Sequence, residues 1–285
     1  MNPLFFDHAG FIVRDLSSCH ALMAELGFSL TTRADHTMTN AQGQTVSAGS
    51  SQHTIMFEQG YLELMEITNP AAGHQLAAAP AVRYGLHILA LGAVDAKGTH
   101  QNYLEQGQDV GVLRNWSREV READRQGLAR FAFFDAKWTA HDPSYICWVQ
   151  HLTPSLIRSS RDMVHANSAL SVLSIRYAGP VVGNQQWVDR LQGYGIRPLS
   201  TNQSTSVLGL GATTIEVGHQ QDRAHVVPVG IEIGFGSLHS LRQRCISAGI
   251  EYQELPKGSV KVDLRAELGL YLIGRALNHN DGLAG

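Results

Sequence analysis

The sequence has few cysteines, and they lie far apart. Cys19, Cys147 and Cys245 are its three cysteines, and no two of them have the C-x-x-C spacing of a structural zinc site or a redox pair. Small secreted domains that rely on disulfides are much richer in cysteine. The sequence therefore indicates a reducing compartment, and we expect a cytoplasmic protein.

Long apolar runs and an excess of basic charge are also missing. Asp7 and Arg14 interrupt the N-terminal residues before an apolar stretch becomes long enough for a signal peptide or a spanning helix. The formal net charge is -3, which disfavours binding to a polyanion. Walker, G-x-G-x-x-G and G-x-S-x-G motifs are absent from the sequence. We therefore expect neither nucleic acid nor a membrane as a partner.

What the chain does contain is a repeated unit. Its 285 residues, 44% of them apolar, can form the cores of about two domains. In each unit an apolar strand precedes a segment with apolar residues at helical spacing, a glycine closes that segment, and short strand-like runs follow. The four closing glycines are Gly27, Gly107, Gly195 and Gly249.

Each unit therefore has the order of one strand, one helix and about three strands. A single unit would leave sheet edges unpaired, so we expect the units to pair. The predicted fold class is α+β, with four βαβββ modules forming two half-barrel domains over residues 1–155 and 168–285. The strands expected after the first two helices cover residues 28–33, 44–49, 53–57, 61–67, 110–113, 129–134 and 145–151.

Three stretches carry a resemblance to a known family. DHAGFIVRDL, YLELMEI and GLHILAL resemble the vicinal-oxygen-chelate superfamily, which comprises glyoxalase, bleomycin-resistance and extradiol-dioxygenase proteins, and especially its glyoxalase-like branch. The resemblance covers most of the chain and is strongest over residues 1–155. In that family, metal ligands lie on the first and last strands of two paired modules. The resemblance implies that His8, Glu63 and His87 hold a divalent metal ion.

A fourth protein ligand is left open between two residues. Counting back from the proline that follows each of the first two modules aligns Cys147 with Glu63. His151 has the same strand parity as Cys147 and is the alternative.

The donor set that the resemblance implies has a definite chemistry. Two imidazoles and a carboxylate suit zinc, iron, manganese, nickel or cobalt and leave positions open for a substrate. Strand alternation places Glu63 on the same face as Tyr61 and Met65, and we expect that face to point inward. Glu63 is therefore the candidate catalytic residue, able to relay a proton. Pairing with a base such as Arg114 is the alternative explanation for this carboxylate.

Other residues are candidates for substrate binding. Arg114 has the planar fork that binds anions, and Tyr145 offers aromatic surface to an apolar ligand. His53, and with it His36, could line the same cup. The alternatives are an exposed arginine, exposed histidines and a tyrosine that only packs in the core.

The second half of the chain does not repeat these ligands. The position that matches His8 falls near Val172, and the position that matches His87 falls near Gly230 or Glu232, so neither is a histidine. Only Glu216 corresponds to Glu63. We expect the C-terminal domain to lack a complete metal site and to serve structure or to cover the substrate.

Three functions follow from this interpretation. The first is a glyoxalase-like metal-dependent enzyme, an isomerase or lyase for a small oxygenated organic molecule. The second is an iron(II) extradiol-type ring-cleaving dioxygenase. The third is a non-catalytic protein that binds a small molecule or confers resistance to it. In each case the predicted partner is a small molecule, and a homodimer is left open.

Overall fold

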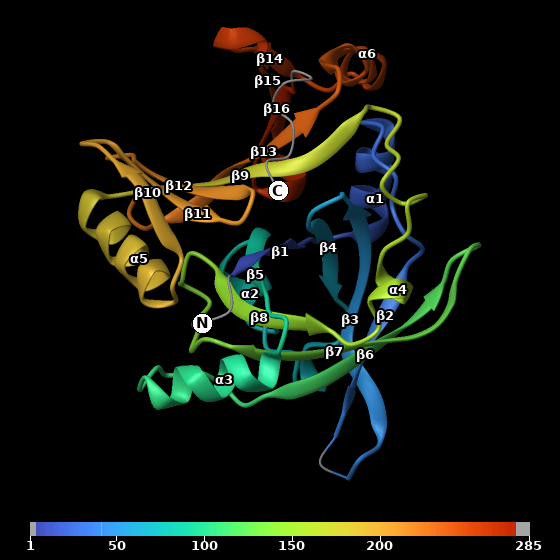
Figure 1. The fold of residues 1–285 in the computed structure, drawn as a ribbon. Coiled ribbons are helices and arrows are strands. Elements are labelled where there is room, and N and C mark those ends of the chain that lie inside the picture. Colours follow the sequence, from blue (N-terminus) through green and yellow to red (C-terminus); the bar gives the residue numbers. More distant parts are fainter. Residues whose placement is uncertain (1–3, 41, 278–285) are drawn as a thin grey trace.

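The computed structural model describes residues 4–40 and 42–277, which form two eight-stranded sheets (Figure 1). The first sheet closes into a barrel with the strand order β1-β4-β3-β2-β6-β7-β8-β5. The second sheet is open, in the order β10-β11-β12-β9-β13-β16-β15-β14. In Figure 1 the open sheet, coloured yellow to red, lies above the barrel.

The barrel consists of two modules of the same element order. The elements of the first are β1 (Phe5–Ile12), α1 (Leu16–Glu25), β2 (Ala34–Thr39), β3 (Thr45–Met56) and β4 (Tyr61–Ile67). Two short helical segments follow, η1 (Pro70–Ala72) and α2 (Ala79–Val82). The elements of the second are β5 (Gly85–Gly92), α3 (Ala96–Glu105), β6 (Arg114–Arg121), β7 (Gln126–Asp135) and β8 (Tyr145–His151).

The open sheet consists of two further modules, which a segment containing α4 (Pro154–Ile157) joins to the barrel. The elements of the third are β9 (Ala169–Gly179), α5 (Val181–Gly193), β10 (Arg197–Thr201), β11 (Thr205–Leu210) and β12 (Thr213–His219). Those of the fourth are β13 (Val227–Phe235), α6 (Leu238–Ala248), β14 (Tyr252–Glu254), η2 (Pro256–Gly258), β15 (Val260–Leu264), α7 (Arg265–Leu268) and β16 (Leu270–Ala276).

The prediction of four paired βαβββ modules in an α+β fold is confirmed. Equivalent residues begin the first two helices, because the side chains of Asp15 and Asp95 accept hydrogen bonds from backbone N–H groups of the first turn. The first module pair goes beyond a half-barrel, since β2 pairs with β6 and closes the sheet. The division into domains at residues 155–167 stays a prediction, although β8 ends at His151 and β9 begins at Ala169.

Two of the expected strands are not present. Residues 28–33 precede β2 as an irregular segment, because the backbone N–H of Ser29 donates to His165 Nδ1 at 3.0 Å and that of Thr31 to the Thr54 carbonyl. Residues 110–113 contribute only an isolated bridge, between Val110 and Ala136. The runs 44–49 and 53–57, expected as separate strands, belong largely to the single strand β3.

The barrel and the open sheet share one apolar core. The cluster extends from the outer face of the barrel, through α1 and α3, to the inner residues of α5, α6 and the open sheet. Phe28 and Phe235 meet across this boundary with ring centroids 6.3 Å apart. The fully buried Tyr103 of α3 donates its hydroxyl hydrogen to the Tyr194 carbonyl at 2.7 Å. This core fixes the open sheet against the barrel.

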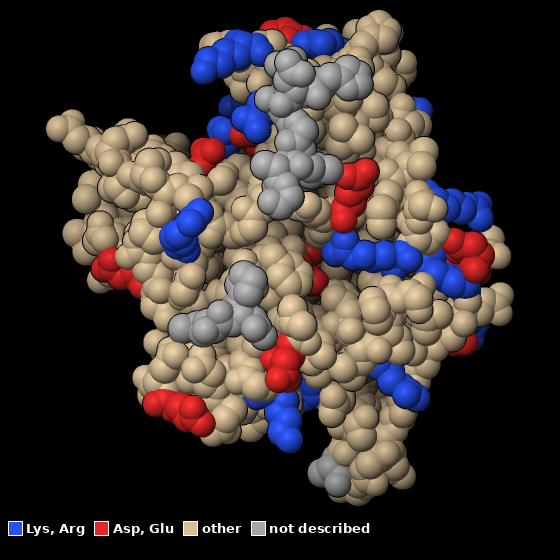
Figure 2. All heavy atoms as spheres, viewed as in Figure 1, with Lys and Arg blue, Asp and Glu red and all other residues tan. Residues whose placement is uncertain are grey.

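The surface has charges of both signs, as the sequence indicates, and the helices are short. Figure 2 shows lysine and arginine interspersed with acidic residues over the visible face, with no large area of one sign. Within residues 4–40 and 42–277, no helix is both long and apolar enough to cross a membrane.

Replacing Tyr103 with phenylalanine tests the contact between the two sheets. The Tyr103→Phe variant leaves the buried Tyr194 carbonyl without its donor, so we expect the free energy of unfolding to fall by about 1 kcal/mol. Urea denaturation followed by circular dichroism measures the change. Tyr252→Phe, at a partly exposed tyrosine, is the control and should unfold as the unmodified protein does. Equal stability of all three proteins would contradict the assigned role of the Tyr103 hydroxyl.

Candidate functional site

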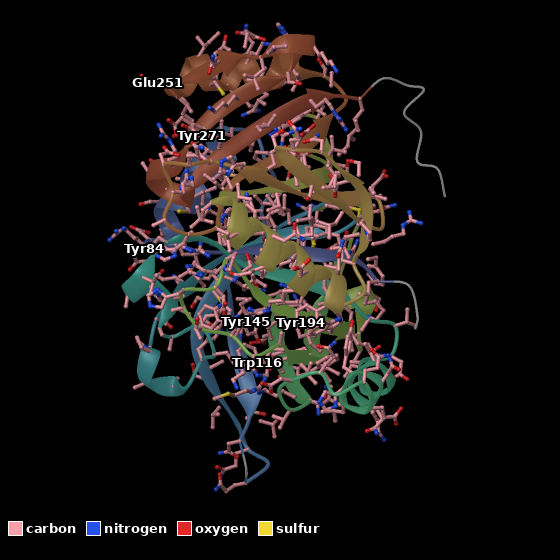
Figure 3. The ribbon with its side chains drawn as sticks, turned by 90° about the vertical axis from the view of Figure 1, so that its left-hand side faces the viewer. Tyr84, Trp116, Tyr145, Tyr194, Glu251 and Tyr271 are labelled. Atoms are coloured by element: carbon pink, nitrogen blue, oxygen red, sulfur yellow. The ribbon has the colours of Figure 1, made fainter. Side chains whose placement is uncertain are left out.

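The interior of the barrel contains a cavity of about 90 Å³ that all eight strands line. Its polar wall includes His8, His36, Gln52, Tyr61, Glu63, His74 and Arg118. The remaining wall is mostly apolar or aromatic, with Met65, Ile88, Trp116, Phe131, Phe133 and Tyr145 among its members. Figure 3 labels Trp116 and Tyr145 within the barrel half of the molecule. A concave site with few polar groups on an apolar wall is typical of small-molecule binding.

The buried carboxylate of Glu63 lies between two imidazoles. The parallel pairing of β1 with β4 sets Gly10 opposite Glu63, and His8 Nε2 lies 3.6 Å from Glu63 Oε2. His36 Nε2, from β2, lies 3.4 Å from Glu63 Oε1. Both distances are too long for hydrogen bonds. The two ring nitrogens therefore face the carboxylate without being bound to it.

The other ring nitrogen of each histidine is held in place. His8 Nδ1 lies 2.7 Å from Asp7 Oδ1, and His36 Nδ1 lies 2.8 Å from Ser50 Oγ. An ionised aspartate can only accept, so Nδ1 of His8 donates to it, and in the neutral form of the ring the lone pair is on Nε2. Hydrogen-bonded outer partners of this kind orient imidazoles that act as metal ligands or as bases.

Gln52 connects this group to a buried arginine. In the amide orientation that satisfies its neighbours, the Gln52 nitrogen donates to His36 Nε2 at 3.2 Å and to the Glu63 carboxylate. The Gln52 oxygen then accepts from Arg118 Nε at 2.8 Å. One amide thus bridges a guanidinium, an imidazole and a carboxylate.

Burial shapes the protonation of the cavity. Burial raises the pKa of Glu63, and the nearby His8 and Arg118 reduce this rise. Burial, aided by the nearby His74 and Arg118, lowers the pKa of His36 to about 3, and burial lowers that of His74 to about 4. At neutral pH an unusually basic carboxylate therefore faces an uncharged His36.

Asp7 links the cavity to a third histidine. Its second oxygen, Oδ2, lies 2.8 Å from His151 Nε2, so a single buried carboxylate joins His8 and His151. Burial alone would raise the pKa of Asp7, but His151 and His8 outweigh it and lower the pKa below its usual value. Asp7 is therefore ionised and fixes the orientation of His8.

A divalent metal ion fits the chemistry of this donor set. Ligands about 2.1 Å from one tetrahedral ion lie about 3.4 Å apart, close to the spacing of each imidazole from Glu63. As they stand, no three His, Cys, Asp or Glu side chains in the described part of the chain form a group that could hold an ion. The Gln52 amide lies beside His36 and Glu63. Turning that amide over presents an oxygen, which suits a cation, at the same place.

The structure does not bring His87 to this cavity. β1 and β5 pair with a register shift, since Gly10 faces Ile88 whereas Phe11 faces Leu86, and His87 is the extra residue of a bulge. Ile88 lines the cavity instead. His87 Nε2 lies 3.0 Å from the Arg83 carbonyl, outside the barrel interior. The structure thus brings Glu63 to His8 but not to His87, and the metal set of His8, Glu63 and His87 stays a prediction.

Two predicted substrate contacts also lie outside the cavity. His53 is paired with Leu64 and directs Nδ1 to the Thr31 carbonyl at 2.7 Å, because strand alternation turns Gln52 inward in its place. Arg114 forms an ion pair with Asp135 at 2.6 Å and is absent from the wall of the cavity.

The remaining predicted residues divide between the cavity and its surroundings. Tyr145 and Cys147 of β8 both line the cavity. Burial raises the pKa of the Cys147 thiol well above its usual value, which disfavours the thiolate that metals bind. His151 lies outside this cavity and pairs with Asp7.

The sequence analysis missed Gln52, His74 and Arg118. Arg118 follows Trp116 and Arg114 at alternate positions of β6, so strand parity could have grouped them. The decisive contact is the pairing of β2 with β6, which sets His36 of one module opposite Arg118 of the next. Nothing in the sequence of either strand indicates this pairing.

In the open sheet, the glutamate that corresponds to Glu63 and a second glutamate beside it form ion pairs with arginines. Arg176 of β9 lies 3.3 Å from Glu216 and is also paired with Glu232. Arg275 Nε lies 3.3 Å from Glu232 Oε1. These two carboxylates therefore have basic partners within their own sheet.

Comparisons with known proteins agree with the fold. Residues 6–194 match the model of the family described as Glyoxalase-like domain. A search of curated proteins found no match. The chain belongs to the glyoxalase-like domain family.

Solved structures with the same fold are distant in sequence. A hypothetical protein from Staphylococcus aureus is 10% identical, with 96% of this chain and 100% of that chain covered and a TM-score of 0.69. A mutant 4-hydroxymandelate synthase from Streptomyces coelicolor is 9% identical, with coverages of 96% and 93% and a TM-score of 0.53. The 2,3-dioxygenase LapB from Pseudomonas sp. KL28 is 9% identical, with coverages of 96% and 92% and a TM-score of 0.51. At these identities the likeness concerns the fold alone.

The role of Asp7 can be tested by removing its charge. In Asp7→Asn the buried His8 and His151 lose a charged acceptor, so we expect the free energy of unfolding to fall by about 3 kcal/mol. Chemical denaturation measures it. Asp109→Asn is the matched control, because Asp109 pairs with Lys137 on the exposed surface, and it should change stability by less than about 1 kcal/mol. Similar small losses in both variants would contradict a buried, ionised Asp7.

Proposed function

We propose that this protein is a metal-dependent enzyme that acts on a small oxygenated organic molecule by glyoxalase-like isomerase or lyase chemistry. One observation carries the proposal: a buried carboxylate, Glu63, faces Nε2 of both His8 and His36 in the cavity of the barrel. His8 and Glu63 keep the roles proposed from the sequence, and His36 takes the place of His87.

The residues that would hold the ion are His8, His36 and Glu63. When bound, a divalent metal ion acts as a Lewis acid for oxygens of the substrate. The protein prepares this site by keeping His36 uncharged and by orienting His8 through Asp7. Neutral imidazoles with fixed tautomers are the form that metals bind.

Glu63 is the residue proposed to move a proton. Its pKa is raised by burial, which makes the carboxylate a better acceptor of a carbon-bound or hydroxyl proton. Tyr61 stacks on His8 with ring centroids 4.4 Å apart and restricts water on that side. The proton would therefore move within a site from which water is largely excluded.

An iron(II) ring-cleaving dioxygenase is the second candidate. The observation that favours it is the donor set itself, because two histidines and one carboxylate with open positions are typical of iron(II) oxygenases. Iron in the purified protein together with oxygen uptake on addition of a catechol would favour this function over isomerase or lyase chemistry. Zinc, nickel or cobalt without oxygen uptake would favour the first.

Metal content tests the proposal directly. Protein purified without added metal should contain about one equivalent of a divalent ion, as measured by elemental analysis. His8→Gln, His36→Gln and Glu63→Gln should each lose it, because each removes one of three ligands. His87→Gln is the matched control and should keep the ion, since His87 lies outside the cavity. Loss of the ion in His87→Gln but not in His36→Gln would overturn the assignment.

A further inference from the structure

Arg118 is a buried cation that no carboxylate contacts directly, although Glu63 lies on the other side of the Gln52 amide. Its side chain lines the cavity and the residue is only 5% exposed. Among the described residues, no carboxylate oxygen lies within 4.0 Å of its guanidinium. Two partly buried arginines do have such a partner, since Arg125 is paired with Asp162 and Arg190 with Asp142. Arg83 has none, but its guanidinium donates to the carbonyls of Leu86 and Pro143.

The hydrogen-bonding groups of Arg118 are mostly unused. Nε donates to the Gln52 oxygen at 2.8 Å, and within the described residues Nη1 and Nη2 have no hydrogen-bond acceptor. Burial lowers the pKa of this arginine, because removal from water disfavours its charged form. Buried charges in proteins are normally paired, and an unpaired one is costly. A ligand that brings an anionic group into the cavity would remove this cost.

The geometry of the guanidinium selects a kind of anion. Its planar fork of N–H groups matches the two oxygens of a carboxylate, and paired N–H···O bonds of this type are stronger than neutral ones. Gln52 fixes the Nε edge of the fork and leaves the Nη edge free. A carboxylate at that edge would be held in the plane of the guanidinium.

The wall beside Arg118 selects the rest of the ligand. Trp116 precedes it by two residues on the same face of β6, and its ring meets Phe133 edge to face, with centroids 5.3 Å apart. Phe131 and Tyr145 extend the apolar surface, and both Trp116 and Tyr145 are labelled in Figure 3. The cavity volume, about 90 Å³, restricts the ligand to a small molecule. An aromatic or branched apolar body fits this wall.

We infer that Arg118 binds the carboxylate of a small carboxylic acid whose apolar body lies against Trp116, Phe131 and Phe133. The inference rests on the proposed function only in taking this acid to be the substrate of the same site.

Binding of a carboxylate and of its uncharged amide tests this inference. Phenylacetate and phenylacetamide have the same shape and differ in charge, and isothermal titration calorimetry measures both. We expect phenylacetate to bind at least tenfold more tightly, because charge-assisted hydrogen bonds are stronger than neutral ones. This comparison uses the unmodified protein and does not depend on the folding of a variant. Equal binding of the two probes, or no binding of phenylacetate at millimolar concentration, would overturn the inference.

Variants on one strand assign the preference to Arg118. Arg118→Gln should lose the preference for phenylacetate, and Arg118→Lys should keep part of it, because lysine retains the charge without the planar fork. Arg114→Gln is the matched control on β6, where Arg114 pairs with Asp135 outside the cavity, and should keep the full preference. A folded Arg118→Gln protein that still prefers phenylacetate would contradict the assignment.

The two proposals fail in different ways. Titrations before and after treatment with a chelator separate them. A protein that holds a metal ion but does not distinguish the two probes refutes the carboxylate site and leaves the proposed function standing. A protein that contains no divalent ion as purified, and that prefers phenylacetate, refutes the metal-dependent function and leaves the carboxylate site standing.

Discussion

The parallel pairing of β1 with β4 is the constraint on which the site depends. It sets His8 opposite Tyr61 and Gly10 opposite Glu63, so the inward side chains of two strands far apart in the sequence meet. A Cβ atom at Gly10 would lie 2.5 Å from Ile88 Cδ1, which means that only glycine allows β1 to lie this close to β5. The absence of a side chain at Gly10 therefore leaves this space to Ile88, which lines the cavity.

Closure of the barrel supplies the rest of the site. The pairing of β2 with β6 sets His36 opposite Arg118, and Gln52 of β3 bridges both to Glu63. In this arrangement Glu63 has an uncharged imidazole and a guanidinium as neighbours, with the aromatic wall of β6 and β7 beside them. A cavity with a basic carboxylate, ligand nitrogens and an unpaired cation is suited to chemistry on a small, partly apolar anion.

The module order was predictable from the sequence because the units repeat, and strand alternation was sufficient to place Glu63 inward. The placement of His87 was not predictable, since a bulge at Leu86–Ile88 shifts the alternation of β5 by one residue, so that Ile88 lines the cavity, and no residue type marks that bulge. The same one-residue difference separates the predicted His53 from Gln52. Arg118 could not be found, because its importance depends on the contact between β2 and β6, and nothing in either strand specifies its partner. The open second sheet repeats the module order of the barrel. At the places that correspond to the cavity residues it has ion pairs around Arg176.

The central claim is that His8, His36 and Glu63 converge on one metal ion. A crystal of the protein soaked in a cobalt(II) salt, measured above and below the cobalt absorption edge, locates the ion by its anomalous scattering. The account predicts one strong peak inside the barrel, within ligand distance of the Glu63 carboxylate and of Nε2 of both histidines. A peak beside His87 or Cys147, or an empty barrel in crystals with cobalt elsewhere, would contradict it.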